Sequence, residues 1–87
     1  MKIYKEYIPI SPNTPIYTDI QGKLLTMEAQ GFSVVAYFDA DSEENHKYII
    51  YMAETGKEAS LPDYQYFRTL MMFNGDYVLH IFIKEVE

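Results

Sequence analysis

The sequence predicts an all-β protein, built as a small antiparallel sandwich or curled barrel of six to seven strands. Segments in which apolar and polar residues alternate, as they do in half-buried strands, recur along the chain. The aromatic residues that strands favour are abundant, with nine Tyr and five Phe among 87 residues. Short groups of Gly, Pro, Asn and Asp separate the segments, which is typical of a chain that turns back on itself repeatedly.

The first half of the chain is expected to hold four strands. Pro9 marks the end or an exposed edge of the first strand, because proline cannot donate a hydrogen bond to a β-ladder. The segment LLTMEAQ has helix propensity as well, but it is short and uncapped. It also precedes Gly31 and a β-branched, aromatic run, so we favour a hairpin of two strands, the second buried on both faces. The expected strands are 3–10, 16–20, 24–30 and 32–38.

The second half is expected to hold three strands. Residues 39–46 form a solvated acidic loop before them. Asn74-Gly75 is a strong hairpin signal, because both residues accept the positive φ angles of a type I′ turn. After this turn the chain alternates, so that Tyr77, Leu79, Ile81 and Ile83 share one face and Val78, His80, Phe82 and Lys84 the other. The expected strands are 47–53, 64–73 and 76–84.

Length and composition limit the classes of protein to which the chain could belong. Eighty-seven residues predict a single compact domain over 1–87. The chain has no Cys, which excludes disulfides and thiolate metal sites. It holds no apolar run of about 20 residues and opens on no signal peptide, so we expect no membrane association. A formal charge of −6 argues against binding DNA or RNA, which needs a basic stripe, but permits one local anion site.

A series of short motifs carries a resemblance that covers nearly the whole chain. The series resembles a family of small proteins common in phage genomes, whose pattern includes Gln-x-Gly-x-Pro, Trp-Ala-x-Val-Asp, Gly-Thr-Gly-His and Val-x-His-Val-Phe. The chain departs from it at Val35, where Trp is frequent, at Glu54, where Gly is usual, and at Lys57, where His is usual. In order, the motifs are an N-terminal Ile3-Tyr4-Lys5-Glu6-Tyr7-x-Pro9-Ile10 strand, Gln21-Gly22-Lys23-Leu24-Leu25, Gln30-Gly31, Val34-Val35-Ala36 with Asp39, Thr55-Gly56 and a last hairpin that ends in Leu79-His80-Ile81-Phe82.

Such short phage proteins look like the anti-CBASS sponges, which bind the cyclic dinucleotides made by bacterial immune synthases and withhold them from effectors. The resemblance implies a non-enzymatic immune-evasion protein in the cytoplasm of the infected bacterial host. Its ligand would be a cyclic dinucleotide, and no cofactor is implied. A small protein covers two nucleotides best by pooling surfaces, so we expect a homo-oligomer with pockets at or near subunit contacts.

The candidate ligand-binding residues gather around one loop, Thr55-Gly56-Lys57. Backbone N–H groups at a Gly turn can surround an anion, while Thr adds a hydroxyl donor and Lys a charge. Arg68, the one arginine in the chain, could hold phosphate with its planar guanidinium. Tyr51, Tyr64 and Tyr66 are the candidates for stacking on purines. The alternatives are that the loop is only a turn and that Arg68 pairs with an acidic residue.

Other motifs predict less. Gly56-Lys57 lacks the spacing of a P-loop, and the acidic loop lacks the Gly and final Glu of a calcium-binding loop, so we expect no metal site. We expect His80 to be a half-buried structural residue, and no arrangement of Ser, His and Asp predicts an enzyme.

Two alternative functions remain open. One is an acidic inhibitor that occupies a host nucleic-acid or defence enzyme through Asp39, Asp41, Glu43 and Glu44. The other is an accessory phage protein without a ligand.

Overall fold

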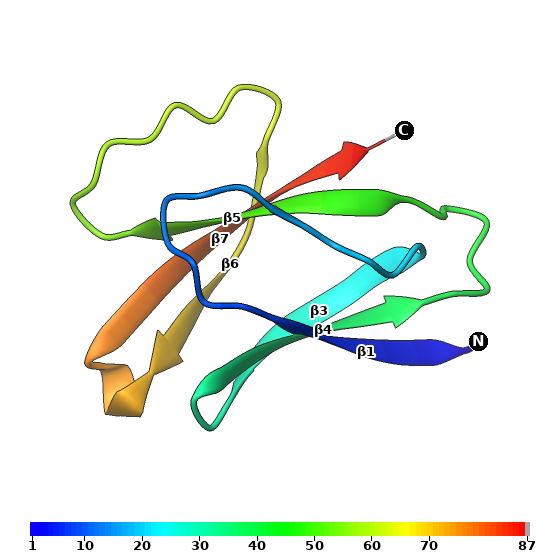
Figure 1. The fold of residues 1–87 in the computed structure, drawn as a ribbon, viewed down its shortest axis with the longest axis horizontal. Coiled ribbons are helices and arrows are strands. Elements are labelled where there is room, and N and C mark those ends of the chain that lie inside the picture. Colours follow the sequence, from blue (N-terminus) through cyan, green and yellow to red (C-terminus); the bar gives the residue numbers. More distant parts are fainter. Residues whose placement is uncertain (87) are drawn as a thin grey trace.

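The structure, a computed structural model that describes residues 1–86, consists of two antiparallel sheets (Figure 1). The first sheet has three strands in the order β1-β4-β3, so that the central strand is the last of the three in the sequence. Its strands are β1 (Ile3–Ile8), β3 (Lys23–Gln30) and β4 (Ser33–Asp39). β3 and β4 form the hairpin that the sequence predicts around Gly31, and β1 pairs with the other edge of β4.

The second sheet has four strands in the order β2-β5-β7-β6. The β6–β7 hairpin turns at Asn74-Gly75, and β5 pairs with the far edge of β7. The strands are β2 (Ile16–Tyr17), β5 (Lys47–Glu54), β6 (Gln65–Met72) and β7 (Tyr77–Val86), and a short 3-10 turn, η1 (Phe73–Gly75), joins the last two. The predicted small antiparallel sandwich is therefore confirmed.

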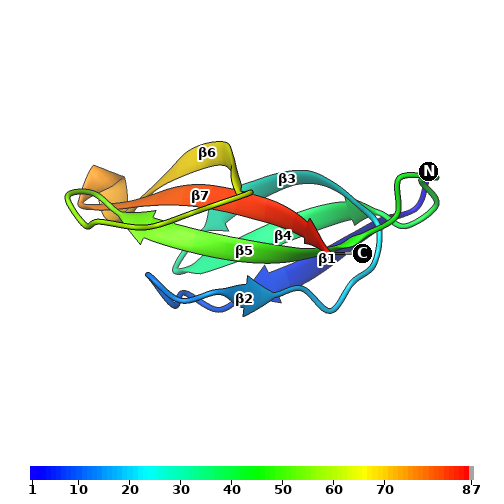
Figure 2. The ribbon, with the colours of Figure 1, turned by 90° about the horizontal axis from the view of Figure 1, so that it is seen from above.

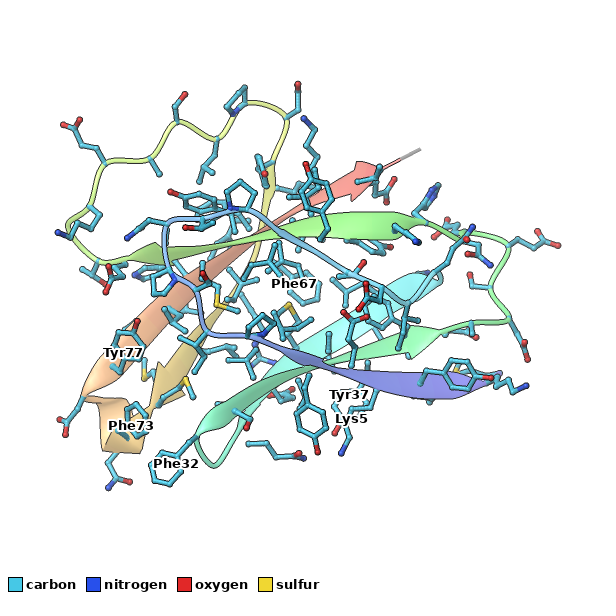
Figure 3. The ribbon with its side chains drawn as sticks, in the orientation of Figure 1. Lys5, Phe32, Tyr37, Phe67, Phe73 and Tyr77 are labelled. Atoms are coloured by element: carbon cyan, nitrogen blue, oxygen red, sulfur yellow. The ribbon has the colours of Figure 1, made fainter. Side chains whose placement is uncertain are left out.

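The two sheets face one another and enclose one hydrophobic core (Figures 1 and 2). Met27, Phe38, Ile50 and Leu79 are fully buried in it, two from each sheet. The inward residues of β7 are those that the alternation predicts, and Phe67 packs against the core from β6 (Figure 3). Because strands alternate their side chains, each sheet also has an outer face turned away from the core.

A second set of contacts joins the sheets where β3 and β5 begin. The Gly22 N–H donates to the His46 carbonyl at 2.9 Å, and the His46 N–H donates back to the Gly22 carbonyl at 3.2 Å. Close by, the Leu24 N–H donates to the Tyr48 hydroxyl at 3.1 Å. A Cβ on Gly22 would lie 2.8 Å from the Asp39 carbonyl oxygen, so only glycine fits without a shift of the backbone.

The positive φ angles predicted at Asn74-Gly75 are confirmed, but the hairpin loop has four residues and not two, because the last pair of the ladder is Met72 and Tyr77. Asn74 and Gly75 have φ angles of 57° and 90°, and the Asp76 N–H donates to the Phe73 carbonyl at 3.1 Å. Phe73 is left-handed as well, at φ 53°, and its ring lies 5.3 Å from that of Phe32 at the tip of the other hairpin (Figure 3). The last strand starts at Tyr77, one residue later than predicted.

Three details of the sequence prediction are corrected. The first strand ends at Ile8, just before Pro9, and the second strand holds only Ile16–Tyr17. The run 32–38 is buried on both faces only in its centre, since Phe32 is 80% exposed at the hairpin tip. No helix among residues 1–86 is both long and apolar enough to cross a membrane.

One long loop lies against the outer face of the four-stranded sheet. It leaves the end of β5, runs through residues 55–64 and returns to the start of β6 (Figure 1, yellow-green). In that view the loop arches on the side of the sheet that faces away from the three-stranded sheet. This loop contains Thr55, Gly56 and Lys57, and therefore places them beside the sheet's outer face.

Candidate functional site

Strand register determines which side chains share the outer face of the four-stranded sheet. β7 is central, and its outward residues His80 and Phe82 pair with Ala53 and Tyr51 of β5 on one side. On the other side, the same two residues pair with Thr69 and Tyr66 of β6. Paired residues of neighbouring strands point to the same face, so these side chains form two adjacent rows across the sheet. One row is Ala53, His80 and Thr69, and the other is Tyr51, Phe82 and Tyr66.

The Thr55-Gly56-Lys57 loop overhangs this face. The Lys57 N–H donates to the Glu54 carbonyl at 3.3 Å and closes a tight turn. Gly56 takes φ +83° within it, a left-handed conformation that side chains disfavour. Between the loop and the sheet lies an open depression of about 350 Å³. It is lined by Ala53, Glu54, Thr55, Gly56, Lys57, Ala59, Leu61, His80 and Phe82.

A chain of hydrogen bonds runs across the sheet from the loop to β6. The Thr55 hydroxyl lies 2.7 Å from Nε2 of His80, and Nδ1 of the same ring lies 3.1 Å from the Thr69 hydroxyl. The Thr69 hydroxyl also lies 2.8 Å from the hydroxyl of Tyr66. Both nitrogens of the half-buried His80 ring therefore have a hydroxyl partner, which agrees with the expectation that His80 is a half-buried structural residue.

Aromatic rings continue the face beyond the depression. Tyr66 packs edge-on against Phe82 with ring centroids 5.7 Å apart, and Tyr51 packs edge-on against Tyr64 at 6.2 Å. Lys84 Nζ lies over the Tyr64 ring, 5.8 Å from its centroid. Burial raises the pKa of the Tyr64 phenol, and the nearby phenols of Tyr17 and Tyr51 raise it further. Tyr66 is 58% exposed, so its ring is open to a partner from solvent.

The structure brings six of the seven predicted ligand residues to one face of the molecule. Thr55, Gly56 and Lys57 line the depression itself. Tyr51 and Tyr66 stand beside Phe82 in the adjacent row, and Tyr64 joins them where the loop returns to the sheet.

Arg68, the seventh predicted residue, lies away from the loop. Its partner in register is Ile81, a core residue, so Arg68 points to the opposite side of β6 from Thr69. Its Nη1 is 2.7 Å from Glu28 Oε1 and donates to the Met27 carbonyl at 3.1 Å. These contacts join β6, at the edge of one sheet, to β3 of the other sheet. The alternative prediction, that Arg68 pairs with an acidic residue, is therefore confirmed.

Two other depressions on the surface suit an anion less well. One, of about 440 Å³, is lined by Asp63, Gln65, Ile83, Lys84 and Glu85, where two carboxylates oppose one ammonium. Another, on the far side of Thr55, includes Glu54 and Asp76. The Thr55-Gly56-Lys57 depression also has an acidic neighbour, but the Glu54 carboxylate accepts a hydrogen bond from Asn13 Nδ2 at 2.9 Å.

The acidic loop of the alternative hypothesis has internal partners. Asp39 Oδ1 accepts hydrogen bonds from the backbone N–H of Asp41 at 3.0 Å and of Lys2 at 3.4 Å. Glu44 lies 3.3 Å from Lys23 Nζ. Two of its four carboxylates therefore stabilise the local structure, and Asp39 is also the last residue of β4.

His80 and Phe82 are site residues that the sequence reasoning did not select. Both line the depression, and His80 contacts Thr55 directly. A signal for them was present, because pairing across the Asn74-Gly75 turn places Thr69 opposite His80. The sequence alone did not show that β5 would deliver the Thr55 loop to the same face, because β5 and β7 are not consecutive strands.

Comparison with known proteins gives the family of the chain. A family model described as "Domain of unknown function (DUF7352)" matches residues 1–87, and the chain therefore belongs to this family. No curated protein and no solved structure shows a significant match.

Proposed function

We propose that this member of the DUF7352 family binds a cyclic dinucleotide on the outer face of the four-stranded sheet and sequesters it without cleaving it. The observation that carries the proposal is the arrangement of one face. There, an open depression bordered by Thr55, Gly56 and Lys57 adjoins a row of exposed and half-buried aromatic rings.

The depression offers donors suited to a phosphate. The backbone is left-handed at Gly56, and because the Lys57 N–H already donates to the Glu54 carbonyl, we assign the Gly56 N–H as the backbone donor to the anion. Lys57 is exposed beside it and brings a positive charge to a chain whose formal charge is −6. Thr55 adds a hydroxyl to the lining of the depression.

The aromatic row offers flat surfaces for the two bases. Tyr66 and Phe82 on one side and Tyr51 and Tyr64 on the other are already arranged edge-to-face, so the pairs hold each other in place. Stacking of a base on an exposed ring contributes about 1–3 kcal/mol. Two such contacts contribute about 2–6 kcal/mol toward the roughly 8 kcal/mol that corresponds to micromolar binding.

Sequestration fits this face better than cleavage does. The Thr55 hydroxyl lies within reach of His80 as a nucleophile lies beside its base, but the group that orients the ring through Nδ1 is the neutral Thr69 hydroxyl and not the carboxylate of a catalytic triad. The depression is shallow and open, so a second copy of the chain could complete it around the ligand. A homo-oligomer, an immune-evasion role in phage infection and action in the cytoplasm of the infected host are parts of this proposal.

Calorimetric titration with a panel of cyclic di- and trinucleotides tests the proposal. We expect heat with at least one member, and a stoichiometry of one ligand shared by two chains. Lys57→Ala should weaken this binding about fivefold, the effect of losing about 1 kcal/mol from an exposed charge contact.

Lys5→Ala is the matched control. Lys5 is also exposed and carries the same charge, but it lies on the three-stranded sheet (Figure 3). Its Nζ lies over the Tyr7 ring. Its loss should leave the affinity unchanged. Absence of heat with every member of the panel contradicts the function. Equal losses in both variants contradict the site and indicate only a general effect of charge.

A further inference from the structure

The hydrogen-bond chain between Thr55 and Tyr66 connects the two halves of the proposed site. At one end Thr55 lines the depression, and at the other Tyr66 carries an exposed ring. Between them stand His80 and Thr69, joined by contacts of 2.7, 3.1 and 2.8 Å along the chain. Neither Thr69 nor Tyr66 lines the depression, so the hydrogen-bond chain extends beyond it along the same face to β6.

The four groups can share their hydrogens in two orders. In the first order Tyr66 donates to Thr69, Thr69 donates to Nδ1 of His80, and Nε2–H donates to Thr55. In the second order every bond is reversed, so that Thr55 donates to Nε2 and Nδ1–H donates to Thr69. A neutral imidazole permits either order, because one of its nitrogens is a donor and the other an acceptor.

The two orders leave Thr55 with opposite properties. In the first, the Thr55 oxygen accepts from His80 and its own hydrogen remains free to donate into the depression. In the second, Thr55 donates that hydrogen to His80, so it can only accept a hydrogen bond from a ligand. A phosphate oxygen accepts hydrogen bonds and does not donate them, so only the first order lets Thr55 bind it.

The chemistry of Tyr66 selects the first order. A phenol is more acidic than an aliphatic hydroxyl, so across the 2.8 Å contact Tyr66 is the better donor and Thr69 the better acceptor. With its oxygen occupied in this way, the Thr69 hydroxyl has its hydrogen available for Nδ1 at 3.1 Å. Nδ1 then carries no hydrogen, and Nε2 must carry the one that neutral histidine retains.

We propose that Tyr66 and Thr69 hold His80 in its Nε2–H tautomer, and that His80 thereby makes the Thr55 hydroxyl a donor specific for acceptor groups such as phosphate oxygens. The ligand in this inference rests on the function proposed above, whereas the order of the chain is a property of the free protein. Thr69 and His80 act as positioning residues, since they work through Thr55.

The tautomer is measurable without any ligand. Two-bond ¹H–¹⁵N spectra at about pH 8.5, where neutral imidazole dominates, separate the two ring nitrogens. His46→Gln assigns the signals, because the chain has two histidines. We expect a protonated Nε2 and an unprotonated Nδ1 for His80. Tyr66→Phe removes the donor and keeps the ring, and it should move the population toward Nδ1–H. A Nδ1–H tautomer in the native protein overturns the proposal.

Affinity for inorganic phosphate, and for each cyclic dinucleotide of the panel, provides the second readout. Thr69→Val should weaken binding roughly tenfold, the factor that corresponds to one charge-assisted hydrogen bond of about 1.4 kcal/mol. Thr69→Ser restores the hydroxyl and should bind as the native protein does. Unchanged affinity in Thr69→Val, with the fold intact by circular dichroism, overturns the link from Thr69 to the anion.

The two proposals fail in different ways. If His80 is the Nε2–H tautomer and neither phosphate nor any cyclic dinucleotide binds, the ligand is wrong and the ordered chain stands. If a cyclic dinucleotide binds and His80 carries its hydrogen on Nδ1, the function stands and the role assigned to His80 is wrong.

Discussion

At the scale of single residues, Arg68 lies away from the depression, whereas His80 lines it. Arginine is the residue most suited to phosphate, but the side chain of Arg68 is engaged by Glu28 and by a backbone carbonyl of β3. His80, expected to be structural, does have two hydroxyl partners, and one of them lines the depression. The sequence could predict the residue types of a site. It could not predict the face of β6 to which Arg68 points, because that face depends on a bulge between Tyr66 and Arg68.

Replacement of Arg68 tests this assignment. Arg68→Ala should lower the free energy of unfolding by about 1 kcal/mol, because the lost ion pair is partly screened by water and the lost hydrogen bonds are few. The side chains of Arg68 and Glu28 are 40% and 46% exposed. Affinity for a cyclic dinucleotide should stay within about twofold, which calorimetry measures beside chemical denaturation.

Lys23→Ala provides the comparison for Arg68. It also removes one positive charge and one ion pair, that with Glu44 at 3.3 Å, and those side chains are 50% and 71% exposed. Its loss should cost less than about 0.5 kcal/mol. A large fall in affinity in Arg68→Ala with stability unchanged would mean that Arg68 reaches the ligand after all.

At the scale of elements, local patterns predicted most of the strands. Alternation and the Asn74-Gly75 turn predicted β7, its two faces and its antiparallel return beside β6. The ends of strands were less predictable. β2 is two residues long, and it pairs with β5, a strand distant in the sequence, which no local pattern encodes.

The junction between β3 and β5 gives a prediction at this scale. Gly22→Ala should lower the free energy of unfolding by about 1–3 kcal/mol, because its Cβ would press on a backbone carbonyl that cannot move alone. The added Cβ would lie 2.8 Å from the Asp39 carbonyl oxygen. A backbone shift that relieved this contact would stretch the reciprocal hydrogen bonds between Gly22 and His46. The denaturation midpoint measures the effect, and an unchanged midpoint would mean that the junction is not a rigid link between the sheets.

At the scale of the whole molecule, the sandwich gives the protein two outer faces with different chemistry. The face of the three-stranded sheet carries Lys5 and Tyr37, paired in register between β1 and β4 (Figure 3). The face of the four-stranded sheet carries the depression, His80 and the aromatic row. The all-β class followed from composition and alternation. The sequence did not predict which face the Thr55 loop would join, since that depends on the pairing of β5 with β7.

The most direct test of the central claim is a map of ligand contacts by NMR. Two-dimensional spectra recorded during titration with the cyclic dinucleotide that binds best should show changes at Gly56, Lys57, His80 and the tyrosine rings of the same face. Signals of Lys5 and Tyr37 should stay in place. Changes centred on the acidic loop or on the three-stranded sheet, or spectra unchanged by every cyclic dinucleotide, would contradict the account.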